Sequence, residues 1–101
     1  MVDKGTRVGA VMNSNDEEVN LFGYGVYVGD HTPVEGVGLF AEMIRKRKDT
    51  NPKIELDNGT VIYGCECWWG SEEGVKKDIG DRKINYINVD EWRKDYTKNN
   101  S

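Results

Sequence analysis

The sequence predicts an α+β fold: a small, strongly bent antiparallel sheet or an SH3-like barrel of about five strands, with two or three short helices. Three observations predict it. Short apolar runs alternate with Gly, Pro, Asn and Asp along the chain. Three of these runs carry apolar groups on both faces, as expected of strands that are covered on both sides. Other segments carry helical spacing and helix-cap residues. With 101 residues, the chain has the length of one domain, 1–101.

A predicted β-hairpin at Asn58-Gly59 is the central element. Asn-Gly tolerates the positive φ angles of a two-residue type I′ turn. The first arm, Lys53–Asp57, alternates apolar and polar residues, so one face is expected to be buried and the other wet. The second arm, Thr60–Trp69, is apolar on both faces. We expect protein or a ligand to cover both sides of this arm.

The other elements follow from local patterns. Further strands are expected at Thr6–Met12, Val19–Val28 and Lys83–Val89. Helices are expected at Leu39–Lys48, at Glu72–Ile79 between a Ser71 cap and a Gly80 stop, and at Glu91–Tyr96 after an Asp90 cap. Thr32-Pro33, with Glu35 two residues later, matches a helix start. The polar tail Thr97–Ser101 is expected to fray.

Composition narrows the class of protein. The net charge of −4 disfavours a general nucleic-acid binder, although it leaves room for a local basic patch. The chain lacks an apolar run long enough to span a membrane and an N-terminal signal sequence, so we expect a cytoplasmic protein. Cys65 and Cys67 are two residues apart on one strand and are poorly placed to bond to each other, which fits a reducing compartment.

Glu66 is the first candidate for a functional side chain, because it lies between two cysteines in an apolar strand. A buried carboxylate is costly without a partner. Glu66 is therefore expected to pair with an arginine such as Arg7, Arg45 or Arg82, to face solvent at an edge strand, or to contact a ligand.

The sequence does not favour catalysis or a metal site. A closed zinc site needs four ligands, whereas Cys65, Cys67 and His31 supply three. Thiols in an apolar strand are usually inert as nucleophiles. We therefore expect no catalytic residue, no metal and no cofactor. The alternative is a small hydrolase that uses Glu66 with Asp30 or His31.

Aromatic residues and glycines suggest a binding surface. Two glycines, Gly23 and Gly25, expose a strip of backbone, which indicates either a bent strand or a floor for a flat ligand. Aromatic rings near such a floor can stack on a planar ring, or they can simply fill the core. The candidate ligand-binding residues are Tyr24, Tyr27, Asp30, Glu66, Trp68 and Trp69.

A run of cations ends the predicted helix at Leu39–Lys48. Arg45, Lys46, Arg47 and Lys48 complement the helix dipole, which accounts for them without a ligand. They are also a candidate anion-binding patch. The alternative that follows is a nucleic-acid-binding module of the SH3-like barrel type.

Two segments, GYGVYVGD at Gly23–Asp30 and NPKIELDNGTVIYGCECWWG at Asn51–Gly70, resemble those of small proteins encoded by bacteriophages and related mobile elements. The resemblance carries no activity. It implies a small viral accessory protein in the cytosol of the host cell, acting without catalysis. Its partner would be a host defence protein, in an anti-defence role, or a small nucleotide-like molecule. Such proteins commonly form homodimers, and an exposed tryptophan would suit one.

Overall fold

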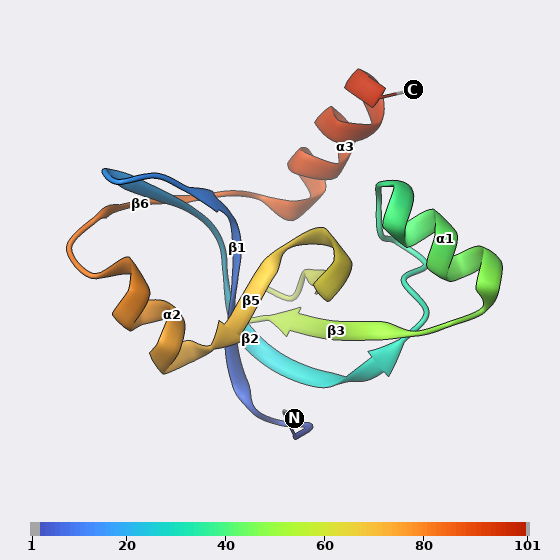
Figure 1. The fold of residues 1–101 in the computed structure, drawn as a ribbon, viewed down its shortest axis with the longest axis horizontal. Coiled ribbons are helices and arrows are strands. Elements are labelled where there is room, and N and C mark those ends of the chain that lie inside the picture. The colour runs from blue at the N-terminus through green and yellow to red at the C-terminus, as the bar shows by residue number, and fades with distance from the viewer. Residues whose placement is uncertain (1–2, 101) are drawn as a thin grey trace.

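The computed structural model describes residues 3–100, with the side chains of residues 3–98, and confirms the α+β class. Six strands form one sheet that is not closed into a barrel, in the order β4-β3-β2-β1-β5, with β6 paired to β2. The strands are β1 Arg7–Ser14, β2 Glu18–His31, β3 Asn51–Leu56, β4 Val61–Tyr63, β5 Trp68–Ser71 and β6 Lys83–Tyr86. The helices are α1 Leu39–Arg47, α2 Glu72–Ile79 and α3 Val89–Asn100 (Figure 1). None of these helices has the length and apolar character needed to cross a bilayer.

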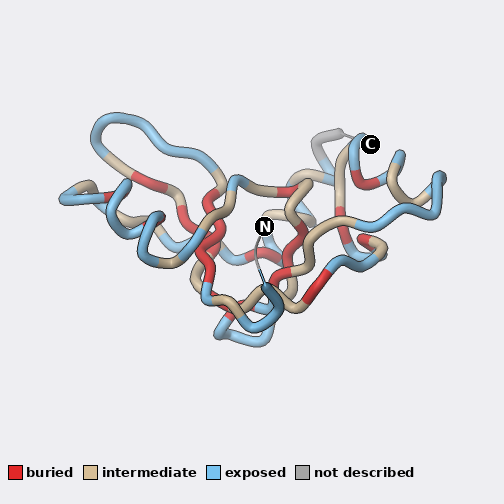
Figure 2. The backbone as a smooth tube through the Cα atoms, turned by 60° about the horizontal axis from the view of Figure 1, so that its bottom comes forward, coloured by how far each residue is buried: buried red, intermediate tan, exposed pale blue. Residues whose placement is uncertain are grey.

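The long strand β2 organises the sheet. It pairs antiparallel with β1 along one edge. Its other edge has two partners in succession: β6 pairs in parallel with residues 18–21, and β3 pairs antiparallel with residues 25–31. The buried residues are concentrated in these central strands, whereas the helices and connections are largely exposed (Figure 2).

Helices cover the two faces of the sheet and create two cores. On one face, Val75 and Ile79 of α2 pack with Val11, Val19 and Leu21. On the other face, Val89 at the start of α3 packs with a larger set, and Trp92 lies against it. This second core contains Val8, Ala10, Phe22, Ile54, Leu56 and Ile62.

A bulge in β2 corrects the predicted alternation of that strand. The register shifts so that Phe22 is an extra residue between Leu21 and Gly23. Phe22 packs in the core beside α3, while Tyr24 lies against the core beside α2, whereas uninterrupted alternation along the strand would place residues 22 and 24 on the same side. A bulge reverses the sides of all the residues that follow it.

The backbone at Gly25 is covered by a neighbouring strand. A Cβ atom at Gly25 would lie 2.7 Å from the Cα of Leu56 and still closer to the carbonyl oxygen of Glu55. Strand β3 therefore occupies the space beside Gly25. Gly23 lies at the bulge with a φ of 141°. The glycines thus serve the strand's bend and the close approach of a neighbouring strand.

The central hairpin forms, but its turn differs from the prediction. Leu56 pairs with Thr60, and the N–H of Gly59 donates to the carbonyl of Leu56, so the loop contains three residues. Only Gly59 has a positive φ in this loop, at 89°. A two-residue type I′ turn needs two such residues, whereas a three-residue loop needs one.

The predicted strand Thr60–Trp69 is not continuous. It consists of β4, a 3-10 turn called η1 at Gly64–Glu66, and β5. β4 pairs with β3, whereas β5 pairs with β1 at the opposite edge of the sheet. The turn carries the chain from one edge to the other, so the two-faced pattern reflects two short strands in different environments.

Helix boundaries are partly as predicted. α2 is correct, with Ser71 accepting from the N–H of Gly74 at 3.0 Å. Thr32-Pro33 does not start a helix, because α1 begins after Gly38. The side chain of Asn88, rather than Asp90, accepts from the N–H of Glu91 at the start of α3. α3 also continues through residues 97–100 of the tail that was expected to fray; Ser101 lies outside the described residues.

Candidate functional site

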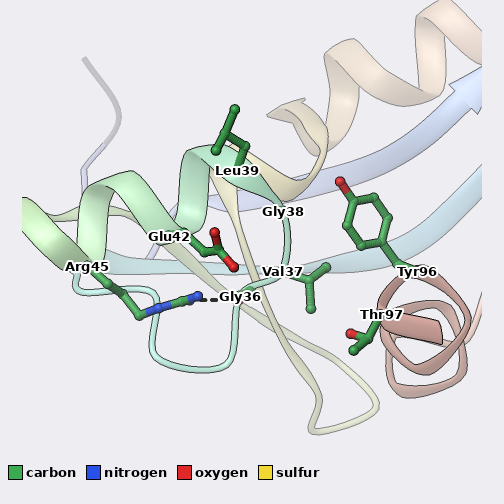
Figure 3. Close-up of a pocket in the computed structure, with 8 residues that line it drawn as sticks. All are labelled: Gly36, Val37, Gly38, Leu39, Glu42, Arg45, Tyr96 and Thr97. Atoms are coloured by element: carbon green, nitrogen blue, oxygen red, sulfur yellow. Dashed lines mark hydrogen bonds between the residues drawn. The ribbon is translucent and has the colours of Figure 1, made fainter. Parts of the chain in front are cut away.

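One large hollow in the described structure is a cleft between α1 and α3. The connection Gly36-Val37-Gly38 forms its floor, α1 forms one wall, and the C-terminal half of α3 forms the other (Figure 3). Its volume is about 490 Å³, within the range of ligand pockets. A smaller hollow of about 270 Å³ adjoins it and shares Val37, Gly38, Leu39 and Tyr96. Phe40, Cys65, Glu66 and Trp92 complete the lining of this second hollow.

Glu66 anchors the base of this region through four hydrogen bonds. Its carboxylate accepts from Arg93 Nη2 at 2.7 Å and from Arg93 Nε at 3.0 Å. It also accepts from the backbone N–H groups of Tyr63 and Val37, each at 3.1 Å. The Glu66 side chain is fully buried. These four hydrogen bonds occupy the carboxylate oxygens of Glu66 and connect η1, α3 and the floor of the cleft.

The expected ion pair of Glu66 is therefore present, but its partner is none of the three arginines proposed from sequence. Arg7 binds Asp57 and Glu72 instead. Arg45 donates to the carbonyl oxygen of Pro33 at 2.6 Å and to that of Gly36 at 2.7 Å (Figure 3). Arg82 pairs with Asp78. Arg93 lies in α3, which comes after all six strands in the sequence, and no local sequence pattern links it to η1.

A further hydrogen bond fixes the same connection. The hydroxyl of Tyr63 donates to the carboxylate of Glu35 at 2.7 Å. Burial and the nearby Glu35 carboxylate raise the pKa of Tyr63. Together with the hydrogen bonds of Arg45 and Glu66, this bond fixes the segment between β2 and α1, which includes the floor of the cleft.

Three apolar side chains of α1 are exposed at or beside the cleft: Leu39 lines it, Phe40 lines the adjoining hollow, and Met43 follows one turn further along the helix. Leu39 and Phe40, in the first turn of α1, are 68% and 70% exposed, and Met43 in the next turn is also exposed. We call these three residues the apolar rim. Within α1, Ala41 is the buried residue. The helix turns its smallest apolar residue inward and leaves these larger ones exposed.

The predicted aromatic site residues do not share one surface. Tyr27 stacks on Trp69 with ring centroids 5.8 Å apart, and its hydroxyl donates to Asp30 at 2.7 Å. That hydrogen bond raises the pKa of Tyr27. Trp68, at the start of edge strand β5, is 56% exposed. Asp30 and the Trp69–Tyr27 pair are thus brought together, while Trp68 and Glu66 are separate from them.

Tyr24 belongs to a second, shallower region on the α2 side. The Nζ atom of Lys76 lies 5.0 Å from its ring centroid, and burial raises the pKa of its hydroxyl. Tyr86, at the end of β6, is 71% exposed beside it. Two hollows of about 230 and 280 Å³ both have Tyr24 and Tyr86 in their linings. The hollow of about 230 Å³ lies where β6 and β3 both end, and we call it the Tyr86 notch. Its lining residues are Phe22, Gly23, Tyr24, Leu56, Asp57, Asn58 and Tyr86.

The basic residues at the end of α1 divide into two groups. Arg45 points at the carbonyl oxygens beneath the cleft, whereas Lys46, Arg47 and Lys48 are exposed. Lys48 ends the helix in the left-handed conformation with a φ of 58°. The four cations are therefore not one anion-binding set.

The cysteine thiols have raised pKa values. Burial, with the nearby Glu66 carboxylate, raises the pKa of Cys67 to about 12 and also raises that of Cys65. Both cysteines are free of a disulfide. Within the part of the chain that the structure describes, His, Cys, Asp and Glu side chains form no group of three that could hold a metal ion.

Sequence reasoning missed the residues that shape the cleft, above all Leu39, Tyr96 and Arg93. The signal available was the paired glycines Gly36 and Gly38, which indicate a connection rather than a first helical turn. Comparison with known proteins adds no assignment: no family model, curated protein or solved structure matches this chain.

Proposed function

We propose that this protein is a binding protein without catalytic activity of its own, and that it engages another protein at the cleft between α1 and α3. The apolar rim carries the proposal. Two adjacent large side chains, Leu39 and Phe40, are about 70% exposed; Leu39 lines the cleft and Phe40 lines the hollow that adjoins it. Apolar side chains gathered beside a concavity are typical of interaction sites.

The polar groups near the cleft support binding over catalysis. Glu66 is engaged by four donors, so its carboxylate is not available as a general base. The thiols of Cys65 and Cys67 remain protonated near neutral pH because their pKa values are raised. The alternative of a small hydrolase needs Asp30 or His31 as a second group, but both are exposed at the end of β2, where Asp30 accepts a hydrogen bond from the hydroxyl of Tyr27.

The resemblance of two segments to phage-encoded proteins supplies a context. In that context the partner is a host protein, such as a component of a defence system. Protein interfaces commonly use a few large apolar anchors surrounded by a polar rim. Leu39 and Phe40, with Glu42 beside Leu39 in the lining of the cleft, fit this composition.

Affinity capture with matched variants tests the proposal. Phe40→Ser removes a ring from the rim, whereas Tyr86→Ser removes an equally exposed ring outside the cleft. We expect wild type and Tyr86→Ser to retain a near-stoichiometric protein from the host lysate, and Phe40→Ser to lose it. The captured protein is then purified and its affinity measured for each variant. Equal affinity of wild type and Phe40→Ser would contradict the proposal.

A second candidate function is favoured by the Tyr86 notch. The exposed Tyr86 ring, near Tyr24 and the backbone of Gly23, could stack on the base of a small nucleotide-like ligand. A ligand present at 100 times its dissociation constant adds about 2.7 kcal/mol to the free energy of unfolding. Thermal unfolding with a nucleotide panel measures this. A shift that Tyr86→Ala removes and Phe40→Ser leaves intact supports this candidate, and no shift rejects it.

A further inference from the structure

The outer face of α1 changes in character along its length. Phe40, Met43 and Arg47 follow each other at helical spacings of three and four, so they lie along one stripe of the helix. Leu39 and Lys46 lie beside this stripe at the same spacings. The stripe is apolar in the first two turns and cationic in the last. Ala41, which is buried, marks the opposite face.

The cationic end of the stripe stands out in an acidic protein. Residues 39–48 contain Arg45, Lys46, Arg47 and Lys48 against the single carboxylate of Glu42, so their net charge is +3. Because the whole chain has a net charge of −4, the remaining residues together carry −7. Within residues 3–98, Lys46, Arg47 and Lys48 form no ion pair with a carboxylate. These three cations are therefore available to a partner.

We infer that the partner segment at this site is an acidic amphipathic helix, whose apolar side chains enter the cleft beside Leu39 and Phe40 and whose carboxylates lie along Lys46, Arg47 and Lys48. This inference rests on the proposed function and specifies the chemistry of its partner. A helix that lays its apolar face into a hydrophobic groove is a common mode of recognition. Here the two walls are themselves helices, α1 and α3, so a third helix can pack into the groove between them.

The spacing of the two sets of contacts follows from helix geometry. Phe40 and Arg47 are seven residues apart, and a helix rises about 1.5 Å per residue, so the apolar and cationic ends are separated by about 10 Å. A partner helix that lies parallel to α1 matches this separation when its carboxylates come about seven residues after its apolar anchors.

Other anionic partners fit less well. Nucleic acid would engage the cations but would have no use for exposed Leu39 and Phe40. A membrane-surface helix carries apolar residues along its whole length, whereas those of α1 lie at one end, where Leu39 and Phe40 line concave hollows. Duplex DNA and anionic vesicles therefore serve as competing probes in the test.

The test measures fluorescence anisotropy with fluorescein-labelled peptides of 14 residues. One peptide has Leu and Phe anchors followed after seven positions by Glu residues. A second has Lys in place of Glu, and a third is a scrambled form of the first. We expect the acidic peptide to bind about tenfold more tightly than the lysine peptide at low salt, with the difference shrinking as salt rises. Its circular dichroism should gain helical signal on binding.

Paired variants locate the site. Lys46→Glu/Arg47→Glu should abolish the preference for the acidic peptide, and Phe40→Ser should weaken both peptides. The control Lys77→Glu/Lys83→Glu makes the same change in net charge at exposed positions outside the cleft and should leave binding unchanged. Unfolding curves for every variant show that loss of binding is not loss of fold.

Each outcome gives a decision. If the acidic and lysine peptides bind equally and both depend on Phe40, an apolar docking site stands and the acidic partner is rejected. If only phosphatidylserine vesicles or duplex DNA bind, or if no peptide binds, the inference is overturned. The captured host protein then still decides the proposed function, because that experiment does not depend on peptide design.

Discussion

The carboxylate of Glu66 and the guanidinium of Arg93 meet at two points, with Oε1 2.7 Å from Nη2 and Oε2 3.0 Å from Nε. Arg93 Nη2 also donates to the carbonyl oxygen of Val61 at 2.9 Å. The pair therefore ties α3 to η1 and to edge strand β4. The wall of the cleft that α3 provides depends on this contact between residues 27 positions apart in the chain.

Replacing Glu66 by glutamine should strongly destabilise the protein. The change keeps the side-chain shape but leaves the guanidinium of Arg93, whose side chain is only 12% exposed, without its counter-charge. Breaking a buried pair in this way costs about 3–5 kcal/mol, and we expect the lower end because Arg93 retains some contact with water. Urea unfolding measures the loss.

The exposed pair Arg82–Asp78 provides the control for this experiment. Asp78 is 61% exposed, so Asp78→Asn should cost less than about 1 kcal/mol. The double variant Glu66→Gln/Arg93→Met removes the unpaired charge and should recover part of the stability. A loss below about 1 kcal/mol for Glu66→Gln alone would show that the pair does not hold α3 in place.

Gly25→Ala should destabilise the sheet through a steric clash between strands. A Cβ atom there meets the backbone of Glu55 and Leu56, and backbone cannot move aside as a flexible side chain can. Overpacking of this kind costs about 1–3 kcal/mol, and we expect the upper end. Gly70→Ala is the matched control, because its Cβ would lie 3.9 Å from Val75, at ordinary contact distance. Equal stabilities of the two variants would contradict the close approach of β3 to β2.

Cys67 should react very slowly with iodoacetamide while the protein is folded. Only the thiolate reacts, and a pKa of about 12 leaves about one molecule in ten thousand ionised at pH 8. In urea the pKa returns to about 8.5, so the unfolded protein should be alkylated readily. Mass spectrometry of peptides from native and unfolded samples measures both rates. Rapid native labelling of Cys67 would show that the thiol is not buried as described.

Acid should weaken the protein partly through Arg7. Its guanidinium, 2.6 Å from Asp57 and 2.7 Å from Glu72, lowers the pKa of both carboxyls. A carboxyl with a lowered pKa in the folded state adds stability above its unfolded value of about 4, and this stability is lost as the pH falls through the folded value. We therefore expect Arg7→Gln to show a shallower loss of stability below about pH 4 than wild type.

Urea unfolding at a series of pH values measures this dependence, with Lys77→Gln as the control for removal of an exposed cation. Parallel stability curves for wild type and Arg7→Gln would mean that the two carboxyls titrate alike in the folded and unfolded states.

Elements whose signals are local were predictable from sequence. Ser71 and Gly80 bound α2 as expected, and α1 covers nearly the range assigned to it. Cap residues and stop glycines act through contacts a few positions away, so the sequence contains all the information that they require.

Features that depend on distant segments were not predictable. The bulge at Phe22 arises from the pairing of β2 with β1, and the 3-10 turn at Gly64–Glu66 arises because β4 and β5 pair at opposite edges. Both features break the period-two pattern on which assignment of side-chain faces depends. The sequence pattern of Thr60–Trp69 fits one continuous strand as well as it fits two short ones.

The candidate site was predictable only in part. Glu66 was recognisable as a carboxylate in need of a partner, but Arg93 reaches it through the placement of α3, which no local pattern specifies. The apolar rim was not predicted, because the spacing of Phe40 and Met43 identifies one face of a short helix but does not show whether that face points inward.

The division of one edge of β2 between two partners also bears on how the chain reaches its native state. Residues 18–21 of β2 pair with residues 83–86 of β6. This part of β2 is synthesised early, but it cannot form these hydrogen bonds until β6, near the end of the chain, has been synthesised. Such distant pairing slows the search for the native state. During synthesis on the ribosome, the β1–β2 hairpin therefore stays incomplete along one flank until most of the chain has emerged.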